Sequence, residues 1–206
     1  MVTDILFNVA IVVLIVMTKE IVLIGRSNVG KSTLFRELTG QKAKVGRRPG
    51  ITQYPRKVRV GNIFYVDMPG YGFMFKTTKD QQEKTKDLIV EYFESHANEI
   101  MLAIQVIDAA SFLDIADRWE SRGEVPFEIE LYEFLNDLGL DVILAANKMD
   151  RIANKDEALD LIVERLGMLP PWTQWRDKIA PISAKRGQIE PLRSILKDRM
   201  AKLPPS

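Results

Sequence analysis

Residues 25–32 read Gly25-Arg26-Ser27-Asn28-Val29-Gly30-Lys31-Ser32 and fit the pattern G-x-x-x-x-G-K-S/T of a phosphate-binding loop. The aliphatic run 21–24 before them predicts a buried strand, and residues 33–38 predict the first turns of a helix. Glycines let the backbone wrap around phosphate oxygens, while successive N–H groups and the positive end of the helix face the negative charge. A chance glycine-rich turn with a surface lysine is the alternative, and the flanking strand and helix argue against it.

Two side chains of this loop have specific predicted roles. Lys31 is expected to reach the β- and γ-phosphates of a nucleotide, and the Ser32 hydroxyl is expected to bind Mg²⁺. The nucleotide-binding residues predicted here are Gly25, Arg26, Ser27, Asn28, Val29, Gly30, Lys31, Ser32 and Thr33.

The composition is that of an ordinary globular protein without cysteine. With 206 residues, of which 46% are hydrophobic and 28% are charged, the chain is long enough for one α/β domain with a sizeable core. The formal net charge of +1 excludes a general attraction to nucleic acid or to an anionic membrane. The lack of cysteine excludes disulfides and thiolate metal sites, and it suits the reducing cytoplasm, where we expect the protein to act.

The N-terminal range 5–17 is almost wholly apolar. It is shorter than the ~20 residues that span a bilayer. No Lys or Arg precedes it, whereas a signal peptide begins with basic residues, so we expect no membrane partner. Two interpretations remain: an extra strand or helix packed on the domain, or a native start at Met17 with residues 1–16 as an upstream extension. We favour the second, with one domain over residues 17–206.

Hydrophobic runs and amphipathic segments alternate along the rest of the chain, which predicts an α/β fold with a mostly parallel six-stranded sheet and helices on both faces. Gly61-Asn62 predicts a tight hairpin, and hence one antiparallel strand. The range 109–126 is predicted to be a long connection. The predicted strands after the first are 54–60, 62–67, 100–107, 141–146 and 179–182, and the later helices are 82–97, 127–138, 156–166 and 189–200.

The residues after the predicted strands are those that a nucleotide needs, and open α/β sheets bind ligands at this edge. Asp67 is expected to hold Mg²⁺ through water, although a plain turn residue is the alternative, and Gly70 is expected to donate its N–H to a γ-phosphate. Thr52 is a candidate second hydroxyl ligand of Mg²⁺. The second loop predicted to bind the nucleotide is Asp67, Met68, Pro69 and Gly70.

The sequence Asn147-Lys148-Met149-Asp150 predicts the base of the nucleotide. A carboxylate at Asp150 accepts two parallel hydrogen bonds from N1–H and the 2-amino group of guanine, a donor pair that adenine lacks. This feature disfavours an ATP-dependent metabolic kinase. The Lys148 stem is expected to lie on the purine face, and a backbone N–H of the loop Ser183-Ala184-Lys185 is expected to meet the guanine O6.

Together these motifs resemble the five motifs of the translation-factor-related GTPases. Pro49-Gly50-Ile51-Thr52 and the sequence 67–73 resemble the EngB family, also called YihA or YsxC, in the Era-like group. The resemblance implies a single GTPase domain, hydrolysis of GTP to GDP, Gly50, Ile51 and Thr52 as further GTP-binding residues, and a role in assembly of the large ribosomal subunit. In bacteria the family is linked to cell division and septation. The long range 109–126 resembles that of an archaeal-type member.

Tyr71 occupies the position at which signalling GTPases carry a glutamine that orients the attacking water. We therefore expect slow intrinsic hydrolysis unless another group places the water. Era-like GTPases with an asparagine at the position of Asn28 often use K⁺ near the phosphates. The alternative is that Asn28 is a loop residue whose side chain makes a local turn hydrogen bond. The predicted catalytic residues are Lys31, Thr52, Gly70 and Asn28, and the predicted Mg²⁺ ligands are Ser32, Thr52 and Asp67.

The range 41–61 contains seven Lys and Arg residues and no acidic residue. It predicts contact with ribosomal RNA or a pre-ribosomal particle, and a solvated loop is the alternative. We therefore expect a monomeric, Mg²⁺-dependent GTPase of ribosome assembly. The second hypothesis is a regulatory binding module whose GTP form recruits a protein or membrane partner with little turnover.

Overall fold

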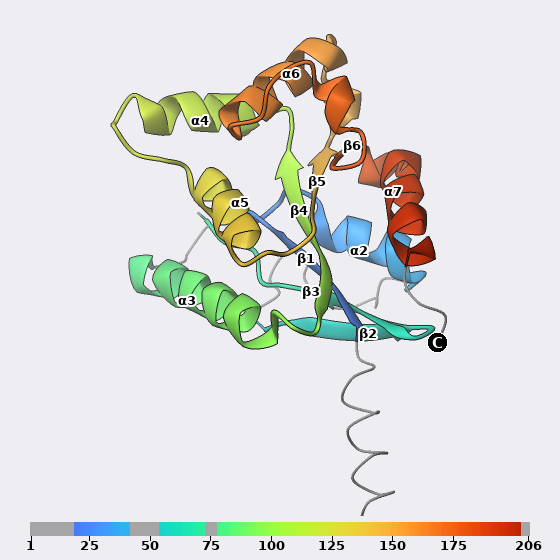
Figure 1. Ribbon diagram of the computed structural model, residues 1–206. Helices are drawn as coiled ribbons and strands as arrows, with labels where there is room; N and C mark the ends of the chain where they lie inside the picture. Colours follow the sequence, from blue (N-terminus) through green and yellow to red (C-terminus); the bar gives the residue numbers. More distant parts are fainter. Residues whose placement is uncertain (1–18, 42–53, 73–77, 203–206) are drawn as a thin grey trace, which may run out of the picture.

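The computed structural model describes residues 19–41, 54–72 and 78–202 (Figure 1). The predicted N-terminal extension lies outside these ranges, as do Gly50, Ile51 and Thr52. The strands are β1 (Lys19–Gly25), β2 (Arg56–Val60), β3 (Ile63–Asp67), β4 (Ile100–Asp108), β5 (Val142–Asn147) and β6 (Ile179–Pro181). The helices are α2 (Lys31–Thr39), α3 (Lys79–His96), α4 (Phe112–Glu120), α5 (Phe127–Asp137), α6 (Lys155–Arg165) and α7 (Glu190–Ala201), with 3₁₀ turns η1 (Met149–Arg151), η2 (Trp172–Trp175) and η3 (Ala184–Arg186).

The six strands form one sheet in the order β2-β3-β1-β4-β5-β6. All neighbouring strands are parallel except β2, which runs antiparallel to β3 after the hairpin at Gly61. The predicted α/β fold and its single antiparallel strand are therefore confirmed. Because the other strands are parallel, their carboxyl ends lie at one edge of the sheet.

Each face of the sheet is covered by helices, which create two hydrophobic layers (Figure 1). Helices α3, α4, α5 and α6 pack on one face, and α2 and α7 pack on the other. Strand β1 is central, and after Lys19 all its residues are buried, as expected for a strand covered on both sides. Within the described ranges, none of the helices is both long enough and apolar enough to cross a bilayer.

The connection 109–126 contains helix α4, which the sequence analysis did not predict. Phe112 and Ala116 are buried one turn apart, and half-buried Leu113 packs against the same core, so the helix presents an apolar face to it. Its charged face contacts α6, where Arg165 pairs with Asp117 at 2.6 Å and with Glu120. The helix is short, so its stability depends mostly on packing of its apolar face, and the contacts with α6 add to this.

A buried carboxylate joins three elements at the amino end of β1. Glu20 is 0% exposed, and its carboxylate pairs with Lys57 of β2. The Tyr92 hydroxyl of α3 donates to Glu20 Oε2 at 2.6 Å. Burial, and then the hydrogen bond to this carboxylate, raise the pKa of Tyr92 above its ordinary value.

The Tyr92→Phe substitution should lower the free energy of unfolding by about 1.5–3 kcal/mol, the range for a hydrogen bond to a charged group. Tyr54→Phe is the control, since Tyr54 is 74% exposed and a surface change of this kind alters stability by about 0.5 kcal/mol at most. Urea unfolding of both variants checks the prediction. Equal stability of Tyr92→Phe and the unsubstituted protein would contradict it.

Candidate functional site

The phosphate-binding loop joins β1 to α2, as predicted. A Cβ added at Gly25 would lie 2.3 Å from the Val106 carbonyl oxygen, so only glycine fits beside β4. Gly30 has φ of 99°, and a Cβ there would lie 2.3 Å from Asn147 Nδ2. Helix α2 begins immediately after it, and the Leu34 N–H donates to the Gly30 carbonyl at 2.9 Å. Both glycines therefore permit close approaches that shape the loop.

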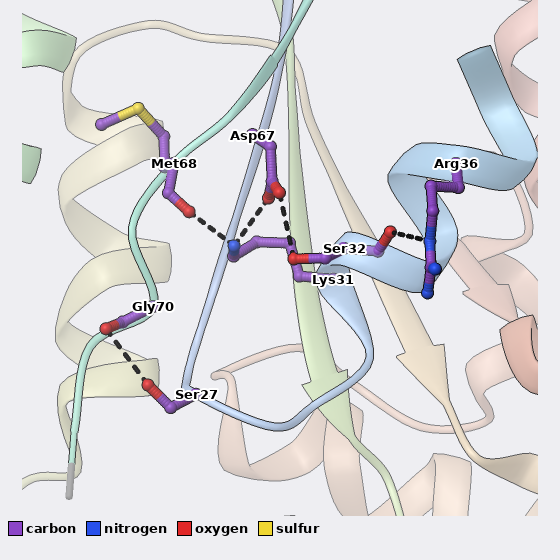
Figure 2. A network of polar contacts seen from close by, with 7 residues as sticks. All are labelled: Ser27, Lys31, Ser32, Arg36, Asp67, Met68 and Gly70. Atoms are coloured by element: carbon purple, nitrogen blue, oxygen red, sulfur yellow. Dashed lines mark hydrogen bonds and ion pairs between the residues drawn. The ribbon is translucent and has the colours of Figure 1, made fainter. Parts of the chain in front are cut away.

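Three predicted site residues meet where α2 begins and β3 ends (Figure 2). The Lys31 ammonium donates to Asp67 Oδ1 at 2.7 Å and to the Met68 carbonyl. The Ser32 hydroxyl donates to Asp67 Oδ2 at 3.0 Å. A hydroxyl and a carboxylate oxygen thus converge beside a cation. These are oxygen ligands of the type that Mg²⁺ prefers.

The segment after Asp67 is attached to the phosphate-binding loop. The Ser27 hydroxyl donates to the Gly70 carbonyl at 3.2 Å (Figure 2), and the Ser27 N–H donates to the Tyr71 carbonyl at 2.8 Å. A Cβ added at Gly70 would lie 2.8 Å from Ser27 Oγ. Pro69 is buried beside them. The structure therefore brings Gly70 against the loop, whereas Thr52 lies outside the described residues.

Asn147 connects the phosphate-binding loop to the loop after β6. Its side chain is 2% exposed, and Nδ2 donates to the Val29 carbonyl at 2.7 Å. Its Oδ1 accepts the Ala184 N–H at 2.9 Å. One carboxamide therefore fixes two of the predicted binding loops relative to each other.

Asp150 lies beside Ser183, as the predicted base-binding site requires. The Ser183 hydroxyl donates to Asp150 Oδ1 at 2.6 Å, and Arg186 lies 3.2 Å from Oδ2. The Ser183 hydrogen bond lowers the pKa of Asp150, so its carboxyl remains ionised below the pH at which an ordinary aspartate protonates. Between these residues, the Met149 N–H donates to the Ile182 carbonyl at 3.1 Å, and the Lys185 side chain is exposed.

Lys148 has a carboxylate partner that the sequence analysis did not assign. Its ammonium lies 2.6 Å from Asp108 Oδ2 and donates to the Asn28 carbonyl at 2.8 Å. Asp108 ends β4 opposite Asn147, so the register of the two strands sets this contact. Its position at the carboxyl end of a buried strand was the signal available in the sequence.

Tyr71 lies in the hydrophobic core, so its side chain is not placed to orient a water molecule. It is 1% exposed and meets the Phe127 ring edge-to-face, with ring centres 4.7 Å apart. Among the described residues its hydroxyl has no hydrogen-bond partner. Burial, and then the nearby Glu128 carboxylate, raise the pKa of Tyr71 well above its ordinary value.

Glu128 is a second residue that sequence reasoning missed. It lies in the first turn of α5, where it is 4% exposed, and its Oε1 is 3.0 Å from Arg26 Nη1. The two residues border a pocket of about 160 Å³ beside the phosphate-binding loop. No local pattern distinguishes this glutamate from the exposed acidic residues of the same helix.

The assembled edge has two chemical halves. A cation and a row of loop N–H groups suit a chain of phosphates near Lys31, while Asp150 and Ser183 suit a base that donates hydrogen bonds. Within the part of the chain that the structure describes, no group of three or more His, Cys, Asp or Glu residues could hold a metal ion by itself. A Mg²⁺ ion fits Ser32 and Asp67, because it commonly takes one or two protein oxygens together with phosphate oxygens and water.

Comparisons with known proteins agree with this geometry. A family model described as "50S ribosome-binding GTPase" matches residues 20–148. A probable GTP-binding protein EngB from Archaeoglobus fulgidus is 46% identical over 185 residues, covering 90% of this chain and 93% of that protein. The probable EngB of Methanopyrus kandleri is 51% identical over 174 residues, covering 82% of this chain and 85% of that protein.

Solved structures show the same relationship. The crystal structure of a probable GTP-binding protein EngB is 39% identical, with a TM-score of 0.81, and the match covers 89% of this chain and 100% of that one. Era from Aquifex aeolicus, at 24% identity and a TM-score of 0.62, shares the fold over 92% of this chain and 58% of its own. From the extent and identity of these matches, the chain belongs to the EngB family of GTP-binding proteins and is a GTPase.

Proposed function

We propose that this GTPase is a Mg²⁺-dependent nucleotide switch in assembly of the large ribosomal subunit. The meeting of Lys31, Ser32 and Asp67 at the sheet edge that also carries Asp150 is the observation that supports it best. In this proposal the N–H groups of residues 25–33 and the Lys31 ammonium surround the phosphates. Gly70 donates its N–H to the γ-phosphate, and Gly50, Ile51 and Thr52 complete the site from outside the described residues.

Ser32 would hold Mg²⁺ directly, Asp67 would hold it through water, and Thr52 would supply a further hydroxyl. When bound, the ion would neutralise charge on the β- and γ-phosphate oxygens during phosphoryl transfer. The residues of the chain would contribute to catalysis by orienting the phosphates along the loop. The 2.7 Å contact between Lys31 and Asp67 keeps the ammonium of this loop directed toward the metal ligands.

Guanine would be recognised by Asp150, with Ser183 as the residue that orients its carboxylate. Each carboxylate oxygen of Asp150 has a lone pair beyond those used by Ser183 and Arg186, so the two oxygens can accept N1–H and the 2-amino group. Lys148, held by Asp108, would lie along the purine, and an N–H in the range 183–185 would meet O6.

The Asp150→Asn substitution should shift nucleotide preference toward xanthosine triphosphate, whose 2-oxo group accepts a hydrogen bond from the new amide. A site built on such bonds discriminates by about 10⁴-fold, so the preference for GTP should shrink or reverse. Competition binding of both nucleotides checks this, with the exposed Asp137→Asn on α5 as control. An unchanged preference in Asp150→Asn would contradict the assignment.

With Tyr71 in the core, we propose that K⁺ and Asn28 replace the missing water-orienting group. Asn28 has φ of 68° at the tip of the loop, and its side chain is exposed while its carbonyl is bound to Lys148. Its side-chain oxygen is therefore available to hold a cation beside phosphate oxygens. The added positive charge would act where an arginine finger acts in other GTPases.

GTP hydrolysis should be faster in KCl than in NaCl at equal ionic strength. We expect at least about a tenfold difference, which is a small part of the ~10³–10⁵ that an arginine finger supplies. Asn28→Ala should remove most of this difference, whereas the exposed Asn98→Ala should keep it. Single-turnover hydrolysis in both salts is the measurement, and identical wild-type rates would exclude the cation.

The ribosomal part of the proposal has separate support. The matching family model is described as a 50S ribosome-binding GTPase, and an Era protein with the same fold has been solved with a segment of 16S ribosomal RNA. Strand β2 is at the end of the sheet and exposes Arg56, Lys57 and Arg59. These cations suit contact with RNA phosphates, and they continue the basic range 41–61.

Neutralising Arg47, Arg48, Arg56 and Arg59 to Gln should weaken binding to ribosomal particles and flatten its salt dependence. The log–log slope should fall by up to ~0.9 per lost phosphate contact. Lys57 is left unchanged because it pairs with buried Glu20. Co-sedimentation over a salt series checks the prediction, with Arg118→Gln and Arg122→Gln as controls. Unchanged binding would favour a solvated loop.

A further inference from the structure

The Arg26 side chain is held by an acidic residue of helix α5. Arg26 is the second residue of the phosphate-binding loop, and Nη1 lies 3.0 Å from Oε1 of Glu128 on α5, 102 residues later. Both side chains are shielded, since they are 24% and 5% exposed. An ion pair in such surroundings is screened much less by salt than one at the surface.

Glu128 needs this cation. Its other oxygen, Oε2, is buried and has no hydrogen-bond partner among the described residues. A carboxylate in the first turn of a helix is favoured by the helix dipole, but leaving a buried charge without its counter-ion is costly. The pair is therefore expected to stay closed, and Glu128 fixes where the Arg26 side chain lies.

Arg26 in turn touches the segment that follows Gly70. A Cβ added at Gly72 would lie 3.0 Å from Arg26 Cγ and Nε, and Gly72 has φ of 88°. The backbones of Arg26 and Tyr71 form a parallel bridge. The arginine is thus packed between α5 on one side and the backbone of the 70–72 segment on the other.

Tyr71 ties the same segment to α5 by a second route. Its ring packs edge-to-face on Phe127, the residue before Glu128, with ring centres 4.7 Å apart. The Gly70 carbonyl accepts the Ser27 hydroxyl (Figure 2). Gly70 is therefore fixed between the loop and a residue anchored on α5.

We propose that Glu128 is a positioning residue for GTP hydrolysis, which holds Gly70 in place through Arg26 and Tyr71. This inference rests on the proposed contact between the Gly70 N–H and the γ-phosphate. GDP has no γ-phosphate, so loss of the Glu128 charge should affect GTP and spare GDP. Substitution of a residue that only stabilised the fold would change the affinities for GTP and GDP equally.

The test is Glu128→Gln, which keeps the size of the side chain and removes its charge, with exposed Glu130→Gln in the same helical turn as control. Affinities for GDP and for a non-hydrolysable GTP analogue are measured together with single-turnover hydrolysis. Glu128→Gln should weaken binding of the GTP analogue and slow hydrolysis, each by about ten- to hundredfold, which is the range for a catalytic group that is slightly misplaced. The affinity for GDP should stay unchanged. Equal losses for both nucleotides, or none, would overturn the proposal.

Two further variants keep the test decisive if Glu128→Gln is unstable. Arg26→Gln with Glu128→Gln leaves no unpaired charge and lets two amides bond, so it should lie closer to wild type than Glu128→Gln alone. A double variant no closer to wild type than Glu128→Gln would overturn the proposal. Gly70→Ala keeps the N–H, but its Cβ would lie 2.8 Å from Ser27 Oγ, so the substitution tests the γ-phosphate contact by displacing that N–H from the loop. No loss of preference for the analogue over GDP would overturn both assignments. A loss there with none in Glu128→Gln would overturn only the role of Glu128.

Discussion

The buried ammonium of Lys31 is the constraint on which the geometry of the site depends. Its side chain is 5% exposed, and a cation so far from water needs an anionic partner. Asp67 reaches it only because β3 pairs with β1 in the register that sets Leu23 beside Asp67. A slip of one residue would turn Asp67 to the other face of the sheet. The hydrophobic side chains that fix the register therefore also fix the contact between the loop and the predicted metal ligand.

The parts of this arrangement that the sequence predicted are those set by local pattern and by topology. The phosphate-binding loop has its own spacing, and parallel strands must carry Asp67, Asn147 and Ser183 to one edge. Helix α4 was missed although Phe112, Ile115, Ala116 and Trp119 recur at helical spacing within its nine residues. The segment is short and Arg122-Gly123-Glu124 follows it closely, so the range was assigned to a connection, and its ion pairs with α6 become visible only once both helices are placed.

The position of Asp108 at a strand end was visible in the sequence, but its pairing with Lys148 and the pairing of Glu128 with Arg26 escaped prediction for a different reason. The partners of these two acidic residues lie 40 and 102 residues away, so no window of sequence contains both members of either pair. A single glutamate in an amphipathic helix is ordinarily exposed, and nothing in 127–138 marks Glu128 as the exception. The sequence showed that a tyrosine occupies position 71, where signalling GTPases have a glutamine. The burial of the tyrosine ring depends on Phe127 and could not be derived from the motif.

The two halves of the site are held by backbone pairing to different extents. Around Asp150 and Ser183, the pairing of β5 with β6 and the Asn147 carboxamide fix both residues, which suits the proposed recognition of guanine in GTP and GDP alike. The 70–72 segment lies beyond the end of β3, and it is held to the loop by one backbone hydrogen bond, the bridge between Arg26 and Tyr71, and the side chains of Ser27 and Arg26. These few contacts can be exchanged without breaking a pair of strands, whereas β5 and β6 cannot shift without losing ladder bonds. In the proposed nucleotide switch, the 70–72 segment is therefore the part that can move, and Asn147 is the fixed reference.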